Sequence, residues 1–313
     1  MTNECFRVLA NCLLLSVVVG GRLAAQEQSA QASQPLAETP FEFSHNLILL
    51  TVELGGARPA RVVFDTGNSA SVLDTAFAKD TGLRPESSPS PAARQANTPA
   101  FYKAVIPHVK VGARVFDNQP LVVTGFSKTA ADEYGVTADG SLGYGFFRGQ
   151  IVQIDFIERK FRLLPAPPAA ANVSTGIVWR KYQSQSPLLI TVDDIVVNGH
   201  HVIAQLDTFF GQSLLLFAAK LPWLKAVPIS AVPSVRYEEA ALSAADAGEV
   251  AWGNFIPRSR GEVYVAGADA HVPETEINAV AGNSFFQGAL LTIDLRSVGR
   301  GGQIYITKQK EPR

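Results

Sequence analysis

The stretch VVFDTGNSASVLD, from Val62 to Asp74, begins as an apolar strand and breaks at Asp65-Thr66-Gly67. An ionised carboxylate among valine and phenylalanine side chains is costly unless it is paired or hydrogen-bonded. Asp65 therefore needs a partner, a shifted pKa or a place in a cleft. A second acid in the same setting elsewhere in the chain would decide how Asp65 is interpreted.

The second half of the chain repeats this plan. The segment SPLLITVDDIVVNGHHVIAQLDTFFGQSLLLF (186–217) follows the order of NLILLTVELGGARPARVVFDTGNSASVL (46–73), which is strand, turn, strand and Asp-Thr. A later segment, LGYGFFRGQIVQIDF (142–156), is answered by AGNSFFQGALLTIDL (281–295). Two landmarks that recur in the same order and at nearly equal spacing indicate an internal duplication. The duplication supplies the second acid, Asp207.

Strand signals dominate both halves. Short runs rich in Val, Ile, Leu and Phe alternate with Gly, Asn and Pro, which is typical of β-strands. Helical periodicity is scarce, and the best short helix is expected within residues 71–83, ending at Gly82. The sequence therefore predicts an all-β fold with a few short helices. A Pro/Ala-rich stretch separates the halves, so we expect a first lobe at 42–164, a linker at 165–182 and a second lobe at 183–313.

The N-terminal segment predicts export. Arg7 is followed by the apolar run VLANCLLLSVVVG and then by GRLAAQ, whose small residues permit cleavage. This pattern predicts a secretory signal peptide at residues 1–25, too short in its apolar core to span a bilayer, with an uncleaved membrane anchor as the alternative. Residues 26–41, rich in Gln, Ser and Ala, predict a flexible lead-in. We therefore expect a periplasmic or secreted bacterial protein without an integral membrane span in the mature chain.

The composition limits the classes of partner and cofactor. With 47% hydrophobic and 18% charged residues the chain is globular, and its net charge of −1 argues against nucleic acid as a partner. Both cysteines, Cys5 and Cys12, lie in the predicted signal peptide, so the mature chain would lack a disulfide and a cysteine nucleophile. The five histidines show no metal-ligand spacing, and no G-x-S-x-G motif or Gly-rich phosphate loop is present. We expect neither a metal nor a cofactor.

The combination of motifs resembles the aspartic peptidases. Asp-Thr-Gly follows an apolar strand, an apolar-Gly pair comes some seventy positions later, and the whole unit is repeated. The two-lobed layout is similar to the pepsin-like branch, whereas the GNSFF, IDL and IDF segments resemble the retropepsin-like bacterial aspartyl proteases. The resemblance runs from about Glu42 to Ile306. It implies two similar acid-protease-like β-barrel lobes, a peptide or protein substrate, and a monomer, because two lobes in one chain replace the dimer of single-lobe relatives.

Two carboxyl groups from the two halves have a chemical use. Carboxyls held about 3 Å apart cannot both ionise, so they share a proton. The ionised member draws a proton from a water that attacks a peptide carbonyl, and the protonated member supplies a proton to the carbonyl oxygen. Asp65 and Asp207 are therefore the candidate catalytic dyad.

The resemblance also implies roles for the neighbours of the dyad. Thr66 and Thr208 would hydrogen-bond across the lobe interface, and Gly67 would let the backbone approach the carboxylate. Ser69 is a candidate hydroxyl near the dyad. Tyr102, in the segment ANTPAFYKAV, is a candidate for the tip of a flap over the cleft. The apolar-Gly landmarks would support the Asp loops: Leu142-Gly143 and Ala281-Gly282.

The second half departs from the family pattern at Phe209, which stands where the first half has Gly67. A ring at this position could fill the substrate site or push the lobes apart, and it disfavours a backbone with positive φ. The leading interpretation is an exported aspartic-type endopeptidase. The alternatives are an inactive protein of the same fold that binds peptide or glycan in the cell envelope, and an envelope scaffold that recruits partners.

Overall fold

A computed structural model describes residues 34–55, 58–83, 102–184, 186–237, 240–258, 262–267 and 270–308. The first half contains β1 (Ala37–Ser44), β2 (Leu47–Leu54), β3 (Ala60–Asp65), β4 (Val72–Asp74), α2 (Thr75–Asp80), β5 (Tyr102–Val111), β6 (Arg114–Thr124), α4 (Phe126–Tyr134), β7 (Gly140–Gly143), the 3-10 turn η1 (Tyr144–Phe147), β8 (Ile151–Asp155) and β9 (Lys160–Leu164).

The second half contains β10 (Val173–Gly176), β11 (Val178–Lys181), β12 (Leu188–Val197), β13 (His200–Leu206), β14 (Leu214–Phe217), η2 (Ala218–Lys220), η3 (Pro222–Ala226), β15 (Ile229–Tyr237), β16 (Ala240–Asp246), β17 (Val250–Trp252), β18 (Glu262–Ala266), β19 (Ala279–Ala281), η4 (Asn283–Phe286), β20 (Ala289–Asp294) and β21 (Gln303–Lys308). The predicted all-β fold with a few short helices is confirmed.

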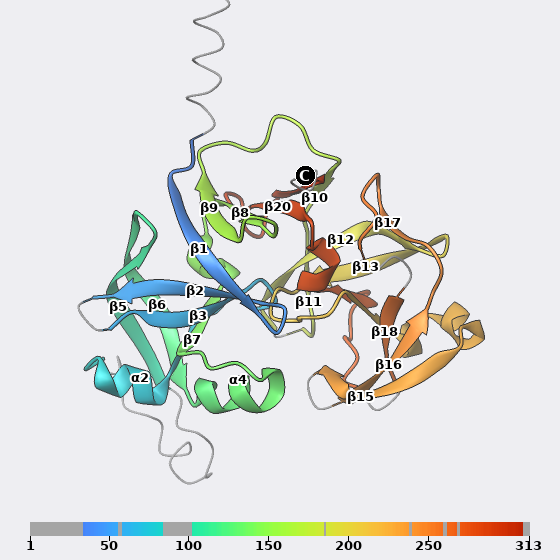
Figure 1. Cartoon of the computed structure of the whole chain (residues 1–313), viewed down its shortest axis with the longest axis horizontal. Helices are drawn as coiled ribbons and strands as arrows, with labels where there is room; N and C mark the ends of the chain where they lie inside the picture. The colour runs from blue at the N-terminus through green and yellow to red at the C-terminus, as the bar shows by residue number, and fades with distance from the viewer. Residues whose placement is uncertain are drawn as a thin grey trace, which may run out of the picture.

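The two halves have the same strand topology. In the first half the strand order is β2-β3-β7-β4-β6-β5, and in the second it is β12-β13-β19-β14-β18-β16. Corresponding pairs also run in the same sense: β3 is parallel to β7 and β13 to β19, while β4 is antiparallel to β7 and β14 to β19. Figure 1 shows the first half on the left and the second on the right. The internal duplication read from the sequence is therefore a duplication of structure.

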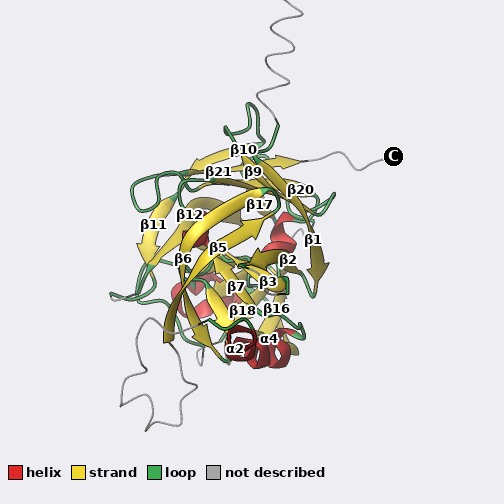
Figure 2. Cartoon of the chain, turned by 90° about the vertical axis from the view of Figure 1, so that its left-hand side faces the viewer, coloured by secondary structure: helices red, strands yellow, loops and turns green. Residues whose placement is uncertain are grey.

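One sheet joins the two halves. Its strands follow the order β10-β21-β20-β8-β9-β1, so three strands come from each half. At its centre β8 and β20 are antiparallel, from Leu290 opposite Asp155 to Asp294 opposite Ile151. In both views this sheet lies at one end of the molecule, and α2 and α4 lie at the other (Figures 1 and 2). Backbone pairing between β8 and β20 thus joins the two halves.

The boundaries of several elements differ from the sequence expectation. β1 begins at Ala37, inside the predicted lead-in, because buried Ala37 and Phe41 anchor it to the core. The predicted linker contains β10 and β11, which pair with β21 and β12. The helix predicted within residues 71–83 is shorter: α2 begins at Thr75, after Asp74 caps it by accepting a hydrogen bond from the N–H of Ala76. The second helix, α4, was not expected.

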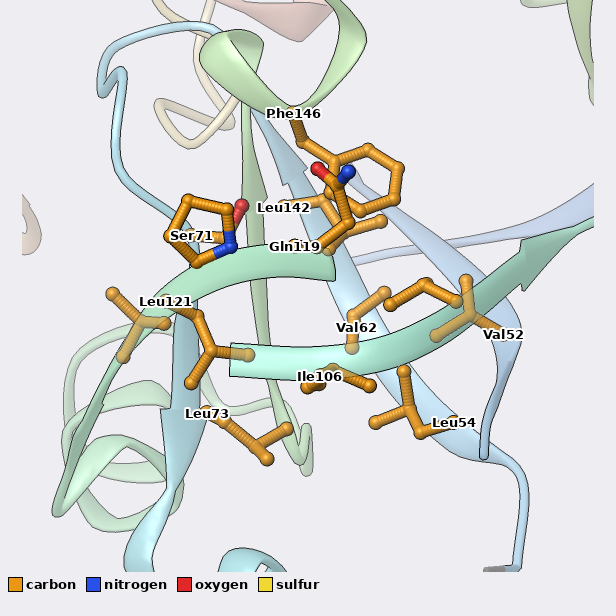
Figure 3. A pocket seen from close by; sticks show the side chains of 13 residues that line it. Val52, Leu54, Val62, Ser71, Leu73, Ile106, Gln119, Leu121, Leu142 and Phe146 are labelled. Carbon is orange, nitrogen blue, oxygen red and sulfur yellow. The ribbon is translucent and has the colours of Figure 1, made fainter. Parts of the chain in front are cut away.

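The core of the first lobe is closely packed. Apolar side chains from β2, β3, β5 and β7 converge on a cavity of about 10 Å³ (Figure 3). A water molecule needs roughly 10–15 Å³ of such space and polar partners. The cavity therefore has room for no more than about one water molecule and is too small for a ligand. Among the described residues, no helix has the length and apolar character needed to cross a membrane.

Candidate active site

The two Asp-Thr loops meet where corresponding strands of the two lobes end. Asp65 is the last residue of β3, and Asp207 directly follows β13. In β3, Asp65 lies opposite Gly143 of β7, while Leu206 of β13 lies opposite Ala281 of β19. Because each Asp ends a central strand of its barrel, the duplicated topology brings one carboxyl group from each half to the interface.

Four buried hydrogen bonds hold the loops together with two-fold symmetry. The N–H of Thr66 donates to Oγ1 of Thr208 at 2.9 Å, and the N–H of Thr208 donates to Oγ1 of Thr66 at 3.0 Å. Each hydroxyl also donates to the opposite strand: Thr66 to the carbonyl of Leu206 at 3.0 Å and Thr208 to that of Phe64 at 2.7 Å. Both threonines are fully buried. The loops are therefore fixed relative to each other.

Both carboxyl groups lie against Gly67. Its N–H donates to Oδ1 of Asp65 at 2.8 Å. A Cβ atom added at Gly67 would lie 2.5 Å from Cγ, Oδ1 and Oδ2 of Asp207. Since the φ angle of Gly67 is not positive, the need for glycine here comes from space and not from backbone conformation. Gly67 thus allows the two acids to approach each other.

The two acids differ in exposure. Asp65 is 6% exposed, whereas Asp207 is half-buried. Burial and the neighbouring Asp207 carboxyl raise the pKa of Asp65 well above its ordinary value of 3.8, although hydrogen bonds from the N–H groups of Gly67 and Asn68 act in the opposite direction. Asp65 therefore retains a proton at a pH where an isolated aspartate is ionised.

The apolar-Gly landmarks pack directly beside the Asp loops. The N–H of Tyr144 donates to the carbonyl of Asn68 at 2.9 Å, and in the second lobe the N–H of Asn283 donates to that of Phe210 at 2.9 Å. A Cβ atom at Gly143 or Gly282 would lie within 2.5 Å of a loop carbonyl oxygen. These glycines are needed because backbone meets backbone at both places.

Asn283 adds a contact that the sequence did not suggest. Its buried side chain donates from Nδ2 to the carbonyl of Thr208 at 2.6 Å and to that of Asn46 at 2.8 Å. It therefore ties the second Asp loop to the turn between β1 and β2.

The backbone of Phe209 makes the same contact as that of Gly67 in the first half, and its ring points to the first lobe. Its N–H donates to Oδ1 of Asp207 at 2.9 Å, as the N–H of Gly67 does to Asp65, and its φ is not positive. The ring packs on the first lobe, with its centroid 4.5 Å from that of Tyr134 and 6.0 Å from that of Phe126. The unexpected helix α4 supplies both of these rings. The lobes are not pushed apart, since the threonine hydrogen bonds are intact.

The structure gives contacts for two other predicted residues, Ser69 and Tyr102, with groups other than the carboxyls. The Ser69 hydroxyl interacts with Tyr144, whose own hydroxyl donates to the carbonyl of Leu188 in the second lobe at 2.5 Å. Tyr102 is the first residue of β5 and pairs with Val123. Residues 96–101 of the flap candidate lie outside the described part of the chain, and residues 103–105 continue β5.

A pocket of about 270 Å³ opens beside Asp207. Gly67 and Asn68 form one wall of the pocket, and the second lobe supplies the others. Those second-lobe residues were not singled out in the sequence, because they come from separate strands and loops without a motif. They are Tyr182, Ser186, Pro187, Leu189, Gln205 and Tyr237.

Gln205 is the most unusual residue of this lining. It is 4% exposed, and its Oε1 atom has no hydrogen-bond partner among the described residues. The described residues contain no group of three or more His, Cys, Asp or Glu side chains that could hold a metal ion.

This arrangement, in which two similar β-barrel lobes each contribute an Asp-Thr loop to one interface, defines the class of two-lobed acid proteases. The sequence profile of a family described as aspartyl protease matches residues 50–146, which include the first Asp loop. The match lies within the first half of the chain and, together with the two-lobed fold, supports a similarity to the aspartic peptidases.

A solved structure shares the fold over most of the chain. The crystal structure of aspartic proteinase from Irpex lacteus superposes with a TM-score of 0.52 at 13% sequence identity, covering 86% of this chain and 97% of that chain. At this identity the likeness concerns the fold alone. No curated protein matches the chain in sequence.

Proposed function

We propose that the protein is an exported aspartic-type endopeptidase that hydrolyses peptide bonds with a water activated by Asp65 and Asp207. The observation that carries the proposal is the position of Gly67, whose N–H donates to Asp65 and where an added Cβ would lie 2.5 Å from the carboxyl group of Asp207. Two carboxyls at one glycine form a pair that can share a proton.

The different exposure of the two acids suggests how the roles divide. Buried Asp65, with its raised pKa, is the member that holds the proton and donates it to the substrate carbonyl oxygen. Asp207 is more exposed and lines the pocket, so as a carboxylate it accepts the proton of the attacking water. The threonine hydrogen bonds keep both groups in place, so little reorganisation accompanies the reaction.

Export is proposed on the apolar run at residues 8–20, which lies outside the described residues. A second candidate function is peptide or glycan binding without cleavage. Its support is Phe209, since the second loop lacks the glycine that the first loop has.

The test is incubation of the purified protein with a complex peptide mixture from about pH 3 to pH 7, with cleavage read by mass spectrometry. The proposal expects cuts that disappear in Asp65→Asn and in Asp207→Asn alike. A folded protein that makes no cuts, or cuts that persist in both variants, would contradict the proposed dyad. Peptide binding that is unaltered in both variants, without cleavage, would favour the binding protein.

A further inference from the structure

The pocket beside Asp207 has a counterpart beside Asp65, defined by the duplication. On β13, Gln205 pairs with Thr191 of β12, and on β3 the equivalent Val63 pairs with Leu49 of β2. The same offset places Leu189 in the position of Leu47 and Phe209 in that of Gly67. Three residues that line the pocket therefore have a counterpart in the other half of the chain. Leu47 corresponds to Leu189, Val63 to Gln205, and Phe209 to Gly67.

These counterparts belong to one packed cluster of apolar side chains. Leu47 and Val63 are fully buried in it, and Phe209 packs against it. Helix α4 supplies Tyr134 and Phe126, whose ring centroids lie 4.5 and 6.0 Å from that of Phe209. The remaining members are Leu49, Val72, Phe126, Ala130, Val136, Ala138 and Tyr134. The volume that is open on the second-lobe side is filled on the first-lobe side.

The solvent exposure of the two acids agrees with this difference between the filled and the open side. Asp65, on the filled side, is 6% exposed, while Asp207, on the open side, is half-buried and lines the pocket. On the open side Gly67 has no side chain, so no side chain at this position occupies the pocket. On the filled side the equivalent residue carries a full aromatic ring.

We infer that the substrate site is one-sided: of the two residues that flank the scissile bond, one places a large side chain in the pocket of Gln205 and Tyr237, and the other must be small. The inference rests on the proposed function, because it assumes that a peptide bond lies over the dyad. An extended peptide directs successive side chains to opposite sides, so the two flanking residues meet the two sides of the dyad. Phe209 is then the residue that sets specificity on the closed side.

The experiment uses three peptides that are identical except for the central pair, which is Phe-Ala, Ala-Phe or Phe-Phe. Cleavage of the central bond is followed by mass spectrometry, and kcat/KM is compared. We expect one mixed peptide to be cut at least about tenfold faster than Phe-Phe, a ratio that the misfit of one large side chain can produce. In Phe209→Ala the difference should fall to within about threefold, since the ring that occupies the closed side is gone.

Phe116→Ala is the matched control. Like Phe209, Phe116 is half-buried, and its ring contacts two others, Phe146 at 4.6 Å and Phe147 at 5.9 Å between centroids. It lies on β6 and does not line the pocket, so its removal should leave the peptide preference unchanged. Phe209→Leu serves as a milder variant, expected to shift the preference in the same direction should Phe209→Ala not fold.

Binding of the same peptides to Asp65→Asn, measured by calorimetry, separates this inference from the proposed function. A one-sided binding preference without any cleavage by the wild-type protein would support the one-sided site and overturn the peptidase. Asp65-dependent cleavage of all three peptides at similar rates would overturn the one-sided site and support the peptidase. Neither binding nor cleavage would overturn both. An equal loss of preference in Phe116→Ala would also overturn the role of Phe209.

Discussion

The substitution Thr208→Val tests the brace between the lobes. Valine has nearly the shape of threonine, so the change removes the hydroxyl and keeps the packing. Two fully buried groups of the first lobe then lose their partner: the N–H of Thr66, at 2.9 Å, and the carbonyl of Phe64, at 2.7 Å. A buried polar group left without a hydrogen bond costs about 1–3 kcal/mol, so we expect unfolding to become easier by about 2–6 kcal/mol.

Urea denaturation followed by tryptophan fluorescence gives the free energy of unfolding of wild type and variant. The control is Thr292→Val, because Thr292 is equally buried and accepts one hydrogen bond, from Nε2 of Gln153 at 3.1 Å. We expect the control to lower the free energy of unfolding by about half as much as Thr208→Val. Thr66→Val should lower it as much as Thr208→Val, because the two threonines make equivalent hydrogen bonds. The reasoning is refuted if Thr208→Val lowers the free energy of unfolding no more than Thr292→Val does, while the slope of this free energy with urea concentration stays the same.

Three further outcomes follow from the site. Gly67→Ala should lower kcat/KM by about 100-fold, because a Cβ 2.5 Å from the Asp207 carboxyl displaces it, whereas Gly176→Ala, which meets open space, should be neutral. Asp65→Asn should stabilise the protein more at pH 7 than at pH 4. The folded-state pKa of Asp65 is raised, so the wild-type protein loses stability as pH rises above about 4, whereas asparagine does not titrate. An equal change in the free energy of unfolding at both pH values would contradict this. Gln205→Leu should stabilise the protein by about 1 kcal/mol, since it removes a buried oxygen that has no partner among the described residues, and a lower melting temperature in calorimetry would refute this.

The sequence predicted the fold well because its signals are local and occur twice. Asp65-Thr66 and Asp207-Thr208 each end an apolar strand, and the turn of the second repeat is a hairpin at Asn198-Gly199, with positive φ at both residues. Helix α4 was missed because Phe126–Tyr134 has only a short apolar face, which is stabilised by packing with Phe209 from the other half. Such a contact between distant segments leaves no periodic pattern in the sequence.

The pocket beside Asp207 could not be predicted for a similar reason. Gln205 sits two positions before Asp207 in a strand that otherwise reads as core, and a single polar residue there has no motif. Tyr237 and Tyr182 lie 55 positions apart and meet only in the folded chain. The sequence does identify Phe209 as a departure, but the direction of its ring depends on Tyr134 and Phe126, which no rule links to the Asp loop.

The sheet shared by the halves has a mechanical consequence. Five residues of β8 pair in register with five of β20, so opening the lobes as a hinge would strain or break this ladder. The buried threonine hydrogen bonds between the lobes oppose the same motion. Under the proposed function, a peptide therefore reaches the dyad past the rim of the pocket, which Tyr237 lines at the end of β15, and not through separation of the lobes.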